Sequence, residues 1–250
     1  MVRHTFGVAV TLLALWGPAA HAGEIKVLSA GAVEPGLVGL LDAFRRDTGQ
    51  GVAVAFATTP AIRRRVTAGE SADVVIAPPA VLDDLVKAGK VLAEGRAVVG
   101  RVGVGVAVRA GGTVPDVSTP EALKQAVLRA DSLVYNEAST GIYFHRLLER
   151  LGVADQVKAK TARYPDGAAV FEHLLRGRVK EVGVGAMTEI IVYTKKGLVL
   201  VGPLPAEVQN YTTYAAAVMA GAASPEAAQG LVRFLTSPQA KAAFAAAGID

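Results

Sequence analysis

Three short segments rich in small and hydroxyl-bearing residues could together bind an anion. They are SAGAVEPG (29–36), ATTPAI (57–62) and EASTGI (137–142), and each lies between an apolar run and a helical pattern. A helix N-terminus offers unpaired backbone N–H groups and the positive end of the helix dipole, and hydroxyls add neutral donors. Each segment alone is explained as well by helix capping, which stabilises by about 1 kcal/mol. Thr59, followed by Pro60, is expected to cap one of these helices, and Gly141 has no Cβ that would keep a ligand from the amides of another. Three segments of one kind favour a shared anion site.

The elements around these segments must bring them together. Apolar runs rich in Val and Ile predict buried strands at 24–30, 51–57, 72–78, 101–112, 132–136, 181–187 and 198–205, with 210–220 crossing back. Helical patterns fall at 35–48, 60–68, 80–88, 139–151 and 168–175, after Thr119, and twice in the C-terminal tail. In open α/β sheets, ligands bind where strands end and helices begin. The alternation predicts two α/β units in series, with a single doubly wound sheet as the alternative.

The N-terminus and the composition restrict the class of protein. Residues 1–22 combine Arg3, an apolar run and a small-residue ending, which predicts a cleaved signal peptide and a periplasmic location, with an uncleaved anchor as the alternative. The chain has no cysteine, which excludes disulfides and thiolate chemistry. The net charge is +4, and the basic residues are scattered along the chain apart from the arginine run at 63–65. We therefore expect no nucleic-acid partner.

Recognisable enzyme motifs are missing from the sequence. It has neither a GxSxG nucleophile motif nor a Walker phosphate-binding loop. His4 and His21 lie in the leader, while His145 and His173 fall within helical patterns without carboxylates at metal-ligand spacing. We therefore expect no catalysis, no cofactor and no resident metal.

Longer stretches carry a resemblance to a known family. VAVAFATTPAIRRRVTAGESADVVIAPPAVLDDLVKAGKV (52–91), STGIYFHRLLERLGV (139–153) and SPEAAQGLVRFLTSPQAKAAFAAAGI (224–249) occur in an order and spacing similar to those of the periplasmic molybdate-binding proteins of ABC importers. The resemblance runs over nearly all of the chain after the leader. It implies a two-lobed periplasmic binding protein of type II, in which each lobe is a mostly parallel sheet flanked by helices and two strands cross between the lobes.

The resemblance also implies where a ligand binds. Two lobes would close on one tetrahedral oxyanion held by hydroxyls and backbone amides, without balancing positive side chains. Together with the three segments, it gives as ligand-binding residues Ser29, Gly31, Ala32, Thr58, Thr59, Ser139, Thr140, Ala168 and Ala186. Ala32 and Ala186 stand where the family has a serine and a tyrosine, so two hydroxyl donors are absent. A hydrogen bond to a charged group is worth about 1.5–3 kcal/mol.

These observations predict a monomeric receptor that delivers a molybdate-like or tungstate-like oxyanion to an ABC permease. Residues 23–103 and 213–250 would form the first lobe and 104–212 the second. The alternatives are another small anion such as a carboxylate, bound with Arg163 or the arginines at 63–65, a receptor partnered with a sensor protein, or an enzyme on the same scaffold.

Overall fold

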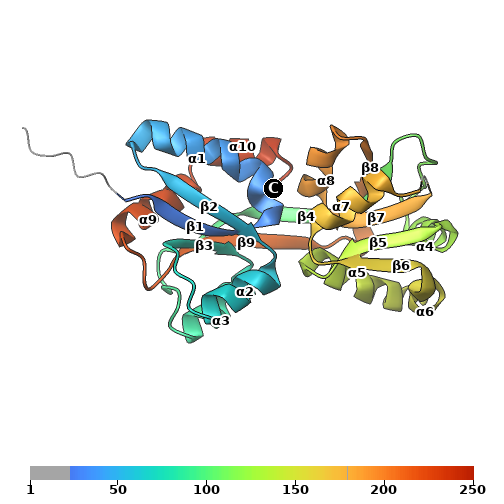
Figure 1. Cartoon of the computed structure of the whole chain (residues 1–250), viewed down its shortest axis with the longest axis horizontal. Coiled ribbons are helices and arrows are strands. Elements are labelled where there is room, and N and C mark those ends of the chain that lie inside the picture. The colour runs from blue at the N-terminus through green and yellow to red at the C-terminus, as the bar shows by residue number, and fades with distance from the viewer. Residues whose placement is uncertain (1–22, 179) are drawn as a thin grey trace, which may run out of the picture.

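The computed structural model describes residues 23–178 and 180–250, which form two α/β lobes side by side (Figure 1). One sheet runs through both lobes in the order β2-β1-β3-β9-β4-β7-β5-β6, and β8 pairs with β4 off this path. The strands are β1 (Ile25–Ala30), β2 (Val52–Ala57), β3 (Val74–Ala77), β4 (Ala97–Arg109), β5 (Ser132–Asn136), β6 (Thr161–Tyr164), β7 (Glu181–Ala186), β8 (Leu198–Pro203) and β9 (Tyr211–Val218). The two-lobed fold implied by the resemblance is confirmed.

Helices cover the faces of the sheet in each lobe (Figure 1). They are α1 (Glu34–Thr48), α2 (Thr59–Thr67), α3 (Pro79–Lys87), α4 (Pro120–Arg129), α5 (Ser139–Arg150), α6 (Ala154–Val157), α7 (Gly167–Arg176), α8 (Met187–Thr194), α9 (Pro225–Phe234) and α10 (Pro238–Ala246), with short 3-10 turns η1 (Gly31–Val33), η2 (Lys158–Lys160) and η3 (Ala206–Val208). None of the helices described has the length and hydrophobicity of a membrane-spanning segment. The predicted signal peptide, 1–22, lies outside the described residues.

Parallel pairing aligns the strand ends that precede the candidate segments. In the first lobe β1 pairs with β2 and β3, and Ala30 lies opposite Ala57. In the second lobe β5 pairs with β6 and β7, and Asn136 lies opposite Tyr164. Because parallel strands end at one edge of a sheet, η1 and α2 begin side by side in one lobe, as α5 and α7 do in the other.

Two antiparallel strands connect the lobes. From Ala97 to Gly103, β4 pairs with β9, and from Val104 onward it pairs with β7 and β8. The hydrophobic cores of the two lobes meet at the same place in β4, since Val102 belongs to the first-lobe core and Val104 to the second-lobe core. The ladder through β4 and β9 is therefore the connection about which the lobes are arranged.

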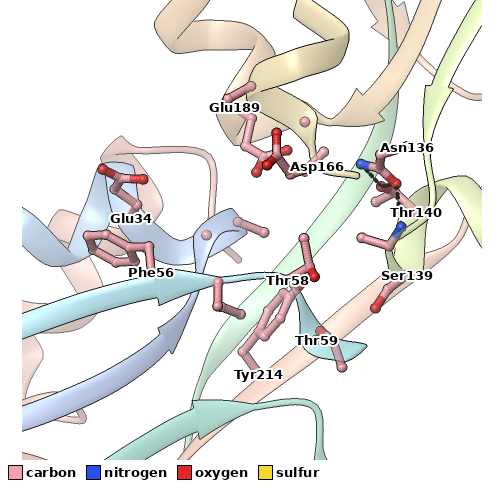
Figure 2. Close-up of a pocket in the computed structure, with 18 residues that line it drawn as sticks. Glu34, Phe56, Thr58, Thr59, Asn136, Ser139, Thr140, Asp166, Glu189 and Tyr214 are labelled. Carbon is pink, nitrogen blue, oxygen red and sulfur yellow. Dashed lines mark hydrogen bonds between the residues drawn. The ribbon is translucent and has the colours of Figure 1, made fainter. Parts of the chain in front are cut away.

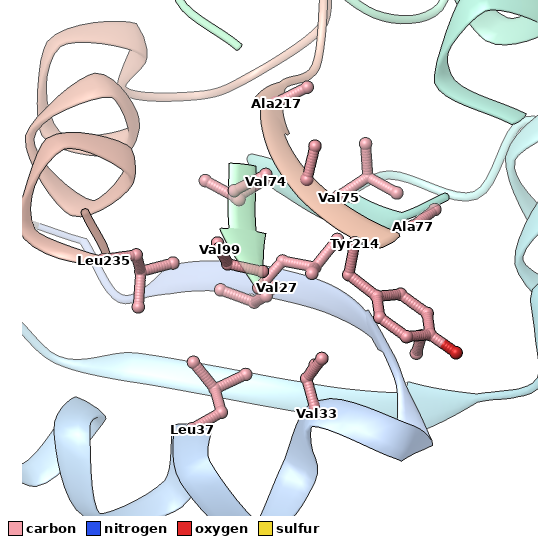
Figure 3. Packing of buried hydrophobic residues seen from close by; sticks show 14 of the residues in the cluster. Val27, Val33, Leu37, Val74, Val75, Ala77, Val99, Tyr214, Ala217 and Leu235 are labelled. Carbon is pink, nitrogen blue, oxygen red and sulfur yellow. The ribbon is translucent and has the colours of Figure 1, made fainter. Parts of the chain in front are cut away.

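The first-lobe core holds the edge of the sheet that carries η1 and α2. Buried Val27 of β1, Val74 of β3, Leu37 of α1 and Leu235, just after α9, belong to one hydrophobic cluster (Figure 3). Burying a side chain of this size contributes about 1.5–3 kcal/mol. This packing fixes the start of α1 relative to the strand ends.

Candidate functional site between the lobes

A cavity of about 200 Å³ lies where η1 and α2 of the first lobe face α5, α7 and α8 of the second. Eighteen residues line it, and Figure 2 shows them. Eight of the nine predicted ligand-binding residues are among them, namely Gly31, Ala32, Thr58, Thr59, Ser139, Thr140, Ala168 and Ala186. The fold thus brings together positions more than 150 residues apart in the sequence, such as Gly31 and Ala186.

Ser29 is the predicted residue that the fold does not bring to this cavity. Its side chain is fully buried in β1, and its hydroxyl donates to the carbonyl of the next residue, Ala30, at 3.2 Å. The side chains of successive strand residues point to opposite faces of a sheet. The side chain of Ser29 is therefore committed to the interior of the first lobe.

The start of α2 presents two hydroxyls to the cavity. The prediction that Thr59 caps this helix is wrong: Thr58 occupies the N-cap, and Thr59 is the first helical residue, followed by Pro60. Thr58 makes no side-chain capping bond, and neither threonine hydroxyl takes part in a hydrogen bond found within the described residues. Both hydroxyls and the first amides of α2 are available to a ligand.

The start of α5 is organised by Asn136, which sequence reasoning did not single out. Its Oδ1 accepts from the backbone N–H groups of Ala138 at 3.1 Å and Gly141 at 3.0 Å, while its amide nitrogen donates to the Thr140 hydroxyl at 3.1 Å. The Thr140 hydroxyl also donates to the same Oδ1, at 3.3 Å. The Thr140 hydroxyl therefore serves the loop, and Ser139 supplies the less constrained hydroxyl at this helix start.

Gly141 has a different role from the one its sequence context indicates. The prediction was that glycine leaves a ligand access to the helix amides. In the structure, an added Cβ at this position would collide with the carbonyl group of Asn136. Glycine is therefore required at this position because the start of α5 passes so close to the backbone of Asn136.

Three carboxyl groups line the side of the cavity opposite the starts of α2 and α5, and none of them was predicted from the sequence. Glu34 comes from the first turn of α1, Asp166 is the N-cap of α7, and Glu189 comes from the first turn of α8 (Figure 2). Asp166 is engaged, because its Oδ1 accepts from Ala169 N at 2.9 Å. Acidic residues are common in the first turn of helices, where they complement the dipole.

Glu189 is the most perturbed of the three. Burial, followed by the neighbouring charges of Asp166 and Glu34, raises the pKa of its carboxyl from 4.5 to about 7. Near neutral pH the protonated and ionised forms are therefore both populated. A carboxyl of this kind is able both to donate and to accept a hydrogen bond.

Two aromatic side chains complete the wall. Phe56 lies at the end of β2, and Tyr214 lies in β9, one of the two connecting strands. Tyr214 is almost fully buried, and its pKa is raised by that burial and by the charge of Glu189, with a smaller opposing effect from a hydrogen bond to Thr212. Its phenol stays protonated at neutral pH and is a hydrogen-bond donor.

The two alanines that replace hydroxyl residues lie where the lobes touch. The buried Thr188 hydroxyl of α8 donates to the carbonyl of Ala32 at 2.7 Å, which joins the second lobe to η1. Ala186 packs in the first-lobe core although it ends β7 of the second lobe. Small side chains at both positions permit this close approach.

The arginines named as alternative anion ligands lie elsewhere. Arg163 lies over the ring of Tyr135, 5.5 Å from its centroid, and lines a separate cavity on the second lobe. Arg63 pairs with Asp84 at 2.8 Å, and Arg65 pairs with Glu70. Among the described residues around the inter-lobe cavity there is no Lys, Arg or His.

Residues 25–250 match the model of a protein family described as "Bacterial extracellular solute-binding protein". A relative named aconitate isomerase, from a Pseudomonas species, is 30% identical over 230 residues, covering 90% of this chain and 87% of the relative. Two solved structures share the fold. The periplasmic molybdate-binding protein of Azotobacter vinelandii has a TM-score of 0.74 at 18% identity, covering 91% of this chain and 99% of that one. The sulfate-binding protein SubI of Mycobacterium tuberculosis H37Rv has a TM-score of 0.72 at 21% identity, covering 90% and 86%.

The family match extends from β1 to the C-terminal residue and so includes both lobes, the connecting strands and every element around the cavity. The chain belongs to the bacterial extracellular solute-binding protein family.

Proposed function

We propose that the inter-lobe cavity binds a small organic carboxylate, which the protein delivers as a periplasmic receptor to a membrane permease. The observation that carries this proposal is the unlike chemistry of the two sides of the cavity. One side offers the hydroxyls of Thr58, Thr59 and Ser139 with the amides of two helix starts. The other side presents Glu34, Asp166 and Glu189 (Figure 2).

A ligand with two different ends suits such a cavity. A carboxylate group of the ligand would lie against the starts of α2 and α5, where amides and the helix dipoles favour negative charge. The other end, near Glu189, would carry a hydroxyl, an acidic C–H bond or a second, protonated carboxyl group. Such groups donate hydrogen bonds or protons to a carboxylate instead of repelling it.

A tetrahedral oxyanion such as molybdate suits it less well. Such an anion needs hydrogen-bond donors on all sides, and this cavity has carboxyl groups on one side.

A thermal-shift screen tests the ligand class. Molybdate, sulfate, malate, tricarballylate and the two aconitate isomers are compared at neutral pH, since a ligand at 100 times its Kd stabilises by about 2.7 kcal/mol. We expect one or more of the organic acids to raise the Tm and the inorganic anions to leave it unchanged. Thr59→Val should weaken that shift, while Thr67→Val, at the far end of the same helix, should not. A shift with molybdate or sulfate alone would refute the proposal.

A second candidate function is isomerisation of a small unsaturated polycarboxylate. The specific observation in its favour is the relative named aconitate isomerase, which is 30% identical and matches both lobes. Aconitate is a tricarboxylate, and it belongs to the ligand class proposed for the cavity. Incubation of the purified protein with cis-aconitate, followed by separation of the acids, would detect conversion to the trans isomer.

A further inference from the structure

The position of the Glu189 side chain sets it apart from the other carboxyl groups of the cavity. One carboxylate oxygen lies 3.4 Å from the place that a Cβ on Gly31 would occupy, and the other lies so close to Gly167 that a Cβ there would collide with it. The carboxyl group therefore sits between the backbones of the two lobes, beside the starts of η1 and α7. The hydrogen bonds identified within residues 23–178 and 180–250 include none to this group.

We propose that Glu189 transfers a proton in an allylic isomerisation of the bound unsaturated carboxylate, an activity that rests on the proposed function of the cavity. The substrate class is a small polycarboxylate in which a CH₂ group bearing a carboxylate is next to a carbon–carbon double bond. Glu189 faces the end of the ligand opposite the anion-binding side, where such a CH₂ group would lie.

This reaction neither consumes nor releases a net proton. The ionised Glu189 takes a proton from the CH₂ carbon, and the C–H electron pair forms a new double bond to the central carbon. The electrons of the old double bond move towards the far carbon and its carboxylate. Protonated Glu189 then returns a proton to that far carbon, which restores the ionised carboxylate. The double bond has moved by one position, and no oxidant, reductant or other reactant is used.

The site also has groups suited to the charge that develops in this reaction. The negative charge spreads onto a substrate carboxylate, which the amides of the α2 and α5 starts and the Ser139 hydroxyl are placed to receive. Preorganised donors aimed at developing charge are among the strongest contributions to catalysis. The protonated phenol of Tyr214, in the wall between the two sides, is a further donor.

The ionisation of Glu189 fits this role. Its pKa of about 7 makes it a stronger base than an ordinary carboxylate, and it is populated in both forms at neutral pH. The charged groups that face it are Asp166 of α7 and Glu34 of α1. Asp166 is held as the cap of α7, and His145 and His173 bond to tyrosines away from the cavity. Glu189 is thus the group in the described lining with the suitable position and ionisation.

The test follows cis-aconitate by proton NMR in deuterium oxide with the purified full-length protein, against a sample without protein. We expect conversion to the trans isomer with incorporation of deuterium at the carbon that receives the proton. Glu189→Gln should bind cis-aconitate in a calorimetric titration and lose about 100-fold or more of the rate, the usual size of a general acid–base contribution. Glu189→Asp should retain part of the rate, and Glu207→Gln, an exposed control, should retain all of it.

The outcomes separate the two proposals. If the wild-type protein binds cis-aconitate and catalyses neither conversion nor deuterium exchange, the catalytic inference is overturned and the receptor function stands. If conversion is undiminished in Glu189→Gln, the assignment of Glu189 is overturned. If no organic carboxylate binds, the proposed function fails and the catalytic inference fails with it.

Discussion

Glu189 is the residue on which the account depends most. Its pKa is raised to about 7, above the ordinary 4.5, chiefly by burial. Between these two values the folded protein keeps a proton that the unfolded chain has released. The free energy of unfolding therefore falls as the pH rises through this window. A group that lowers stability in this way persists where function requires it.

Glu189→Gln removes this pH dependence. A shift of about 2.5 pH units corresponds to at most about 3 kcal/mol, so the variant should exceed the wild type in stability by up to that amount near pH 8. Below about pH 4.5, where both states of the wild type are protonated, the two proteins should have similar stability. Urea unfolding at a series of pH values measures the difference. Parallel pH profiles for the two proteins would contradict the proposed ionisation, and Glu207→Gln serves as the control.

Among the elements of the fold, the N-termini of five helices form most of the site. Helices α1, α2, α5, α7 and α8 all begin at the cavity, and of these only α7 has a side-chain cap bond within the described structure. The amides at the other four starts are not satisfied by their N-cap side chains. We infer that the convergence of several such starts would favour an anionic group of the proposed ligand despite the carboxyl groups opposite.

The start of α5 depends on Gly141. Gly141→Ala would force a methyl group into the carbonyl of Asn136 and displace the loop that holds Ser139 and Thr140. We expect a loss of stability of about 2 kcal/mol or more and loss of ligand binding. Gly39→Ala is the matched control, because that exposed helical glycine has open space around it and should gain about 1 kcal/mol. Equal effects of the two substitutions in thermal unfolding and binding assays would refute this role.

The sequence predicted some elements well and missed others for identifiable reasons. Strand 132–136 and the helix after Thr119 are found as predicted, because apolar runs and a Thr-Pro start are local signals. Helix α8, MTEIIVYT, was not predicted, because its β-branched residues extend the apolar pattern of β7. Glu189 was missed with it. A carboxyl group acquires its raised pKa from burial and distant neighbours, and no local pattern reports these.

At the scale of the whole molecule, the lobes are joined in two ways. The chain crosses between the lobes at β4 and β9, which pair with each other, and the Thr188 hydroxyl donates a hydrogen bond to the carbonyl of Ala32, which joins α8 to η1 beside the cavity. Both lobes contribute to each side of the cavity, since Thr58 and Ser139 line one side and Glu34 and Glu189 line the other (Figure 2). A ligand held between them therefore couples binding to the relative placement of the lobes.

The central claim is that this cavity holds a small organic carboxylate. The most direct measurement is a crystal structure grown with both molybdate and the organic acid that gives the largest thermal shift, with diffraction collected at the molybdenum absorption edge. We predict density for the organic acid between the lobes, with one carboxylate at the starts of α2 and α5 and the other end towards Glu189, and no anomalous peak in the cavity. An anomalous molybdenum peak between Thr59 and Ser139 would contradict the account.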